Sequence, residues 1–311
     1  ISHSLQGAMM VMPGASMLVT NQVTKFTKGN TSFYVHKDGV LDFEPGDTGF
    51  YQWTVVSGKH IVNGEMKVSV PFMGGANQVY GGSGNLAISS IVPASAASTL
   101  TIQDTLTLEL ASDWTTVKDD ADFPFALEVS SFSAPTLKLS DNWTYGAASG
   151  SASTTDPASR AVCIGRCATL TVDAGGYTAK FADPVAGEGT LAIRNGNLKL
   201  ESDISPEVSI ELADTGKLVV DRDMSIGELK ASGGKLLYSG GSLSCASIEN
   251  LDGLEFEFAG GMPERWTTVM VLADKIEELP VIHGLEFRII EASGSVVLQC
   301  RKDAGFRFIV R

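Results

Sequence analysis

The tripeptide Asp-Thr-Gly is the sharpest chemical signal in the sequence, because it occurs twice, at Asp47–Gly49 and at Asp214–Gly216. Two such motifs are typical of proteases in which two carboxylates share one proton and activate a water. That class has apolar residues before each aspartate and serine or threonine after each glycine. Here Gly46 precedes the first motif and Lys217 follows the second. Because Asp and Gly are also common turn residues, we interpret both motifs as strand-to-strand turns.

Two groups of carboxylates offer other chemistry. Asp221 and Asp223 occupy alternate positions of an expected strand, so they would share one side of it, as a general acid and base for glycoside cleavage must. Asp119, Asp120 and Asp122 offer hard oxygen ligands for calcium, but they lack the glycine and glutamate spacing of a calcium loop. We interpret these groups as a solvated edge and a solvated loop. The sequence therefore predicts no catalytic residue, no metal site and no cofactor.

The cysteines and histidines are sparse. Cys163 and Cys167 form a C-x3-C pair with no histidine nearby, which favours a local disulfide or two free thiols over a zinc site. Cys245 and Cys300 end short apolar stretches, so we expect small buried residues, or a second disulfide in an oxidising compartment. The four histidines are scattered and are expected to pack or to face solvent: His3, His36, His60 and His283.

The composition narrows the functional classes. The chain has 311 residues and a net charge of −13, whereas nucleic acid and anionic membrane surfaces both require a basic face. No apolar run approaches the roughly 20 residues of a transmembrane helix. Charged residues make up 19% and there are 33 glycines, which is typical of neither a disordered nor a helical protein. The chain opens with isoleucine, so we expect a processed or excised piece.

A short sequence pattern recurs through most of the chain and predicts the strands that would position these side chains. A glycine or threonine is followed by a leucine or methionine and then by one or two more apolar residues, as in Gly64–Val68, Gly84–Ile88, Gly196–Leu200 and Gly216–Val220. The apolar residues alternate with polar or small ones, which is the period of a strand with one buried face. Such short strands must stack on many neighbours to be stable.

This sequence pattern repeats at about 20 residues and, more finely, at about seven: Met66, Leu86 and Leu106, then Leu198, Leu218 and Leu236, and also Leu229, Leu236 and Leu243. A coil of about 20 residues with three short strands gives both spacings. We therefore predict an all-β fold, a right-handed parallel β-helix (β-solenoid), with Leu198, Leu218 and Leu236 stacked on one internal face. Antiparallel β-sandwich domains remain the alternative, since strand signals alone do not fix the pairing.

The extent of this sequence pattern divides the chain into an expected solenoid and an expected cap. Residues 1–261 are expected to form the solenoid, with an insertion or loop within 111–160, where aromatic residues and then small residues replace the repeat. From residue 262 glycines become rare, and a short helix is expected near Asp274–Leu279, followed by longer strands. A solenoid needs its last apolar layer covered, so we predict that residues 262–311 form a C-terminal cap.

The stretch IVNGEMKVSVPFMGGANQVYGGSGNLAISS, residues 61–90, resembles bacterial autotransporter-associated β-strand repeats. The resemblance, in the general repeat pattern, extends over residues 35–260. It implies a passenger-type β-helix of a secreted or surface protein.

The expected function is structural. We expect an extracellular or cell-surface protein without catalytic activity, either a rigid spacer of adhesin type or a fibre subunit that associates head to tail. The basic, apolar C-terminus predicts the self-associating strand, formed by Phe306, Phe308, Ile309 and Val310. The alternatives are a carbohydrate-active β-helix enzyme and a module that binds surface glycans. Trp114 and Trp266 both stand in W-T-T-V, which we interpret as a repeated structural corner rather than a pair of sugar-stacking aromatics.

Overall fold

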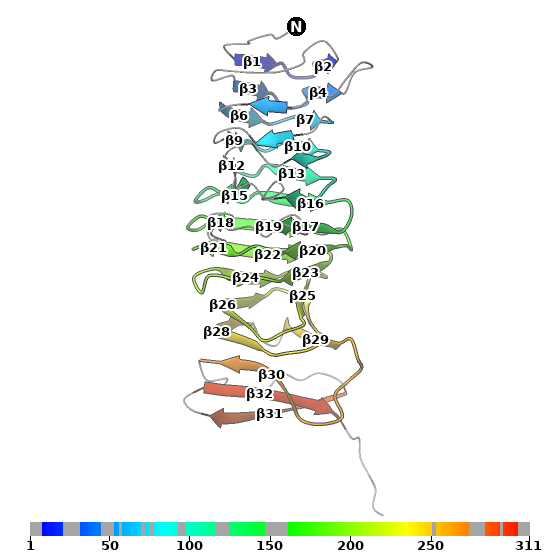
Figure 1. The fold of residues 1–311 in the computed structure, drawn as a ribbon, viewed down its shortest axis with the longest axis vertical. Coiled ribbons are helices and arrows are strands. Elements are labelled where there is room, and N and C mark those ends of the chain that lie inside the picture. The colour runs from blue at the N-terminus through cyan, green and yellow to red at the C-terminus, as the bar shows by residue number, and fades with distance from the viewer. Residues whose placement is uncertain are drawn as a thin grey trace, which may run out of the picture.

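The computed structural model describes residues 8–20, 32–44, 53–55, 58–69, 72–74, 78–92, 98–115, 125–146, 161–250, 253–273, 284–292 and 295–303. These residues form a tall stack of β-strands that runs from the N-terminus at one end to the last strands at the other (Figure 1). No α-helix occurs among them. The expected helix at Asp274–Leu279 falls outside the described residues.

Each coil of the stack contributes strands to two or three walls. The first wall is the 8-stranded sheet, in the order β1 (Ala8–Val11), β3 (Ser32–Val35), β6 (Gly58–Val62), β9 (Gln78–Gly81), β12 (Ser98–Ile102), β15 (Phe125–Val129), β18 (Val162–Ile164) and β21 (Val185–Gly187).

The second wall is the 14-stranded sheet. Its order is β2 (Ser16–Thr20), β4 (Val40–Glu44), β7 (Glu65–Val68), β10 (Asn85–Ile88), β13 (Thr107–Leu110), β16 (Thr136–Leu139), β19 (Thr169–Asp173), β22 (Thr190–Arg194), β24 (Ser209–Leu212), β26 (Met224–Ala231), β28 (Leu243–Glu249), β30 (Thr267–Leu272), β32 (Ser295–Lys302) and β31 (Leu285–Ala292).

The third wall consists of two sheets along the same side of the coil. One has the order β11 (Ile91–Val92), β8 (Phe72–Gly74), β5 (Trp53–Val55). The other runs β14 (Trp114–Thr115), β17 (Trp143–Gly146), β20 (Thr178–Phe181), β23 (Asn197–Leu200), β25 (Lys217–Val220), β27 (Lys235–Tyr238) and β29 (Glu255–Phe258). Residues 125–146, inside the stretch expected as an insertion, thus supply one strand to each wall.

Parallel pairing between successive coils confirms the β-helix and replaces the β-sandwich alternative. Leu198 pairs with Leu218, and Leu218 with Leu236, so the predicted internal column is confirmed. All three side chains have no exposed surface. The finer spacing of seven is the step from one wall to the next, as from Leu229 in β26 to Leu236 in β27.

One predicted column has a different register. Met66 pairs with Leu86 as expected, but the next partner of Leu86 is Leu108 rather than Leu106. Leu106 is also buried, at the corner before β13. The coil is two residues longer here because the corner takes up the extra length, and the strand then keeps its inward residues in line with those of its neighbours.

The core contains both aromatic stacks and aliphatic columns. Near the N-terminus the buried ring of His60 lies between two aromatic rings, with its centroid 5.2 Å from that of Phe33 and 4.4 Å from that of Tyr80. Further along, aliphatic side chains such as Leu198 and Leu218 fill the interior. Aromatic rings stack because their side chains repeat at one position of successive coils, which lie about 4.8 Å apart.

The first wall ends after β21. In the next coil only an isolated parallel bridge between Val185 and Ile204 continues it. One coil later the wall resumes as the first half of β26, where Met224 and Ile226 pair with Leu243 and Cys245 of β28. The strand between β21 and this half of β26 is therefore reduced to one bridged residue.

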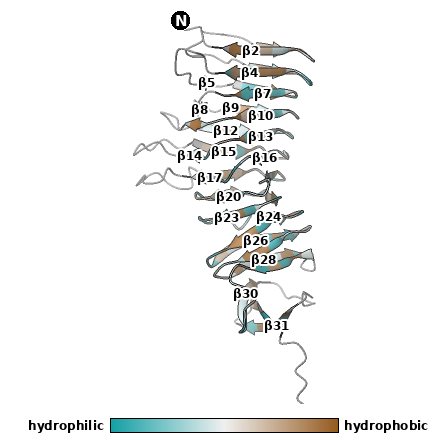
Figure 2. Ribbon diagram, turned by 90° about the vertical axis from the view of Figure 1, so that its right-hand side faces the viewer, coloured by the Kyte–Doolittle hydropathy of each residue, from teal (hydrophilic) through white to brown (hydrophobic). Residues whose placement is uncertain are grey.

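The last strands reverse direction. β32 pairs antiparallel with both β30 and β31, which ends the parallel ladder. The indole of Trp266 stands beside this hairpin, with the guanidinium carbons of Arg288 and Arg301 at 4.4 Å and 4.5 Å from its ring centroid. At the opposite end β2 is strongly apolar (Figure 2), and Met17 and Leu18 are exposed there, at 36% and 57%.

Candidate functional site

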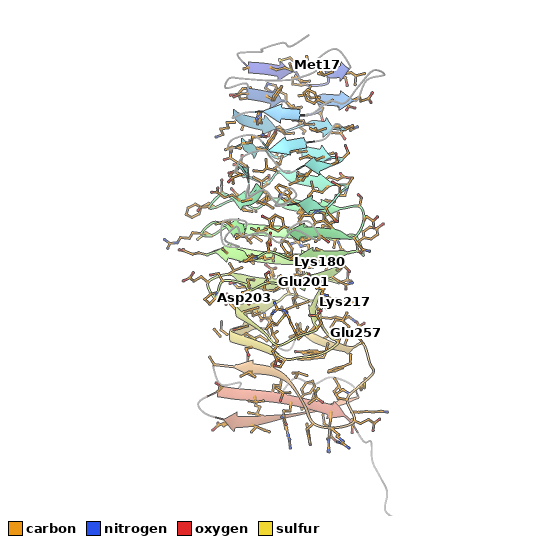
Figure 3. The ribbon with its side chains drawn as sticks, in the orientation of Figure 1. Met17, Lys180, Glu201, Asp203, Lys217 and Glu257 are labelled. Carbon is orange, nitrogen blue, oxygen red and sulfur yellow. The ribbon has the colours of Figure 1, made fainter. Side chains whose placement is uncertain are left out.

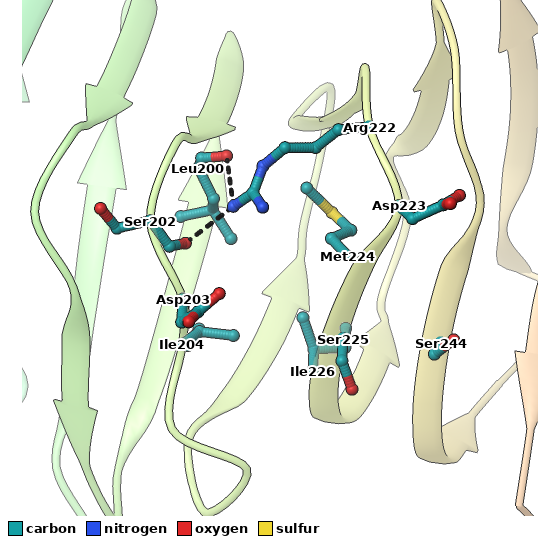
Figure 4. Close-up of a pocket in the computed structure, with 10 residues that line it drawn as sticks. All are labelled: Leu200, Ser202, Asp203, Ile204, Arg222, Asp223, Met224, Ser225, Ile226 and Ser244. Carbon is teal, nitrogen blue, oxygen red and sulfur yellow. Dashed lines mark hydrogen bonds between the residues drawn. The ribbon is translucent and has the colours of Figure 1, made fainter.

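A cavity of about 310 Å³ opens in the side of the solenoid, where the first wall is interrupted (Figure 4). One bank is the segment between β23 and β24, and the other is the corner before β26 together with that strand's first residues. The lining consists of Leu200, Ser202, Asp203, Ile204, Arg222, Asp223, Met224, Ser225, Ile226 and Ser244. The lining side chains alternate between buried and exposed, as they do along a strand. Ile204, Met224 and Ile226 are buried, whereas Asp203, Asp223 and Ser225 are exposed.

Arg222 spans one end of the cavity. Its Nη2 donates to the carbonyl oxygen of Ser202 at 3.0 Å and to that of Leu200 at 3.5 Å. These are carbonyls of the preceding coil, at a level where the strand ladder is interrupted. The Nε of Arg222 is buried and has no hydrogen-bond partner among the described residues. The guanidinium thus takes the place of backbone donors and keeps this end of the cavity polar.

The two carboxylates expected on one side of a strand serve different partners. β25 ends at Val220, so Asp221 and Asp223 lie in a corner rather than in a strand. Asp221 forms an ion pair with Lys199, at 3.0 Å between Oδ2 and Nζ. Asp223 accepts hydrogen bonds from the backbone N and the Oγ of Ser242, both at 2.9 Å. Only Asp223 lines the cavity, because a corner does not impose the strand period of two.

Charged side chains form cross-coil pairs along the third wall (Figure 3). Lys199 contacts Glu201 at 3.4 Å as well as Asp221, and the hydrogen bond that Lys199 donates to the Asp221 carboxylate is the main cause that raises the pKa of Lys199. Lys217 contacts Glu257 at 2.8 Å, and this hydrogen bond lowers the pKa of the Glu257 carboxyl. The Glu257 carboxylate is therefore held in its charged form beside Lys217, which does not suit a general acid.

The cysteines are free thiols. Cys163 and Cys167 are exposed, while Cys245 and Cys300 are buried as expected. Burial raises the pKa of Cys245 to about 12 and that of Cys300 to about 11. The two buried thiols thus stay protonated at neutral pH and behave as small apolar residues.

The other sequence candidates occupy turns, core or undescribed segments. Asp214 lies exposed at a corner with φ of 53°, in agreement with a turn. Trp114 is fully buried in the third wall, whereas Trp266 packs under arginines near the last strands, so the two W-T-T-V motifs are not one repeated corner. The remaining candidates lie outside the described residues: Asp47, Asp119, Asp120 and Asp122, and the self-association set Phe306, Phe308, Ile309 and Val310.

His60 is the most strongly perturbed imidazole. Its Nδ1 accepts a hydrogen bond from the backbone N of Phe33 at 3.3 Å, and its buried Nε2 has no hydrogen-bond partner among the described residues. Desolvation by burial lowers the pKa of His60 to about 4. The ring is thus a neutral core residue at physiological pH, as expected for packing rather than catalysis.

Sequence reasoning missed the cavity. Asp203 belongs to no motif, and its proximity to Arg222 arises only because the first wall is interrupted between the coils that carry them. The local signal was the candidate stretch Asp221–Asp223, of which Arg222 and Asp223 line the cavity. Within the described part of the chain no cluster of three or more His, Cys, Asp or Glu side chains is arranged to hold a metal ion. Nor does any described helix have the length and apolarity to cross a membrane.

Comparison with known proteins leaves the solenoid without a relative to guide its function: no protein-family model matches the chain, and no curated protein or solved structure is significantly similar to it.

Proposed function

We propose that this chain is a structural, non-catalytic protein of a bacterial surface, which serves outside the cell as a rigid spacer, an adhesin-type segment or a self-associating fibre subunit. The observation that carries the proposal is the apolar interior, which forms one cluster of buried side chains among the described residues. Buried side chains are stacked from Phe33 near one end to Leu298 near the other. A stack of this kind gains length and stiffness with every coil, because each coil packs on the next.

The outer face supports the same role. Lysines and carboxylates on neighbouring coils are paired, as in Lys235 with Glu255 at 2.7 Å and Lys138 with Glu109 at 3.4 Å. Each such pair adds little stability by itself, but the ladder leaves a mixed, soluble surface along the rod. Carboxylates paired in this way line a surface, which suits a structural role.

Negative-stain electron microscopy of the purified protein tests this function. We expect straight rods, and filaments of the same width at high concentration. Compact particles without an elongated outline would contradict the spacer and fibre roles together. Binding of the rods to a panel of host or bacterial surfaces, with a heat-denatured sample as control, would separate an adhesin from an inert spacer.

A second candidate function follows from the lateral cavity. Asp203, Asp223 and the hydroxyls of Ser225 and Ser244 offer acceptors and donors that suit the hydroxyl groups of a sugar. This favours a glycan-binding module or a carbohydrate-active enzyme as the alternative. A polysaccharide-cleavage screen with wild type and the Asp203→Asn/Asp223→Asn variant decides it. Cleavage by wild type that is lost in a folded variant would place the enzyme first.

A further inference from the structure

We propose that the lateral cavity is a docking slot for one extended polypeptide strand, and that the strand is the C-terminal segment, residues 304–311, of a second copy of this chain. This docking mode rests on the proposed function, because it specifies one contact through which copies associate. It follows from the backbone groups that face the cavity, from the two closed ends and from the sidedness of the lining.

One bank of the slot offers the backbone of Ile204. Val185 donates to the carbonyl of Asp203 at 3.3 Å and accepts from the N–H of Ser205 at 2.8 Å. In a parallel ladder this pattern turns the N–H and C=O of the bridged residue, Ile204, away from Val185 and toward the cavity. No backbone hydrogen bond of Ile204 occurs among the described residues.

The other bank offers the backbone of Ser225. Met224 pairs with β28, and its N–H donates to the carbonyl of Ser242 at 3.0 Å. Because consecutive strand residues direct their backbone groups to opposite sides, the N–H and C=O of Ser225 face away from β28 and toward the cavity. Both banks therefore present one donor and one acceptor. In a guest strand that runs antiparallel to the banks, one residue exchanges both bonds with Ile204 and the next residue exchanges both with Ser225.

The slot has two closed ends. At one end the guanidinium of Arg222 is fixed to the carbonyls of Leu200 and Ser202. At the other end the two coils approach so closely that a Cβ on Gly227 would collide with the carbonyl oxygen of Pro206. The open length lies alongside residues 223–226, about 13 Å at the rise of a strand. A short strand fits this length, whereas a longer guest must bend out at the corners.

The lining demands a guest with alternating character. Its inward side chains would meet the buried Ile204, Met224 and Ile226, and its outward side chains would lie near the exposed carboxylates of Asp203 and Asp223. Residues 304–311 meet most of this demand in sequence, because Phe306, Phe308 and Val310 alternate with Arg307 and Arg311, while the apolar Ile309 takes the outward position between Phe308 and Val310. The segment carries two arginines and no acidic side chain, while the whole chain has a net charge of −13. Opposite charge thus favours this guest.

Hydrogen exchange measured by mass spectrometry tests the docking. With the full chain we expect the amides of Ile204 and Ser225, which face the cavity, to exchange about tenfold more slowly at high protein concentration than at low concentration, since strand addition protects them. Deleting residues 304–311 should abolish both this protection and the association seen by light scattering. Asp203→Lys should weaken association about tenfold, whereas Glu188→Lys, an exposed charge change outside the lining, should leave it unchanged.

The other possible results separate the docking mode, the second copy as its source and the fibre role. If the chain associates but exchange in the slot does not change with concentration, the strand docks elsewhere, and the docking mode falls while the fibre function stands. If protection is independent of concentration and is lost on deletion, the segment occupies the slot of its own chain, which refutes the second copy. If the chain stays monomeric at every concentration, the fibre role and the docking mode fail together, and the spacer role remains.

Discussion

The coils before and after the end of the first wall are built differently. In the N-terminal coils the partner spacing in the second wall varies, from Val40 paired with Glu65 to Thr136 paired with Thr171. In the C-terminal coils Leu191 pairs with Ile210, and Ile210 with Leu229, so the repeat is 19 residues twice in succession. The N-terminal coils thus differ in length through their corners, whereas the coils from Leu191 to Leu229 keep one length.

This difference teaches where the fold tolerates change. A corner that varies in length leaves the wall register intact, because the strands on both sides still align their inward residues. In the coil that starts at Ile210, strands β24, β25 and β26 are separated only by the corners 213–216 and 221–223, so a change of length there acts directly on the stack. The filling also differs locally, with an aromatic and histidine stack around His60 and an aliphatic column around Leu218.

The largest effect is expected in the short coils. Leu218→Asp places an unpaired charge in the closed column and should cost about 4 kcal/mol of unfolding free energy or prevent folding. Val219→Asp makes the same change on the half-exposed side of the same strand and should cost less than about 1 kcal/mol. Urea unfolding of both variants measures the contrast. Equal losses would show that the inward and outward faces of β25 are wrongly assigned.

The next effect separates the two cores by pH. The pKa of His60 is about 4 in the folded chain against a usual value of 6.5, so the unfolded chain binds a proton that the folded chain excludes. The stability that depends on neutral His60 is complete above pH 6.5 and is lost as the pH falls toward 4. The full loss amounts to about 3 kcal/mol.

The measurement compares urea unfolding of wild type and His60→Phe at pH 7.5, 5.5 and 4.5. The variant keeps an aromatic ring beside Phe33 and Tyr80 but cannot titrate, so its stability should fall less between these pH values. Parallel pH dependence of the two proteins would mean that His60 is accessible to protons in the folded state.

Replacing a corner glycine by alanine should cost the same unfolding free energy in the two regions. A Cβ on Gly84 would collide with the carbonyl oxygen of Gly64, and one on Gly216 with that of Ile193, so the coils approach equally closely in both places. Gly84→Ala and Gly216→Ala should each cost about 2 kcal/mol. Gly260→Ala, which has open space around the new methyl, is the matched control. Thermal unfolding of the three variants measures the costs, and a clear difference between the two corner variants would refute an equal coil spacing.

The smallest effect is expected on the charged face. Lys199 contacts two carboxylates, of Glu201 and Asp221, but its side chain is 32% exposed. Lys199→Met should therefore lower the unfolding free energy by less than about 1 kcal/mol, and high salt should reduce the difference further. A loss of several kcal/mol that persists in high salt would mean that the ladder is a major source of stability in the short coils.

The sequence by itself determined the walls. The alternation in Lys217–Val220 and in Gly196–Leu200 marks strands with one buried side, and such short strands are stable only in a stack. The repeat of about 20 residues then aligns Leu198, Leu218 and Leu236, and this column is in place. Burial of Cys245 and Cys300 also followed from local apolar context.

Only the tertiary structure decided what the corners do. The partner of Leu86 is Leu108 because a corner absorbs two residues, and no local pattern measures that length. The interruption of the first wall at Ile204, the reach of Arg222 to the preceding coil and the enclosure of His60 all depend on which strand lies alongside. Alternation is a property of neighbours in sequence, whereas these features arise between residues about 20 positions apart, whose contact is set by packing of whole coils.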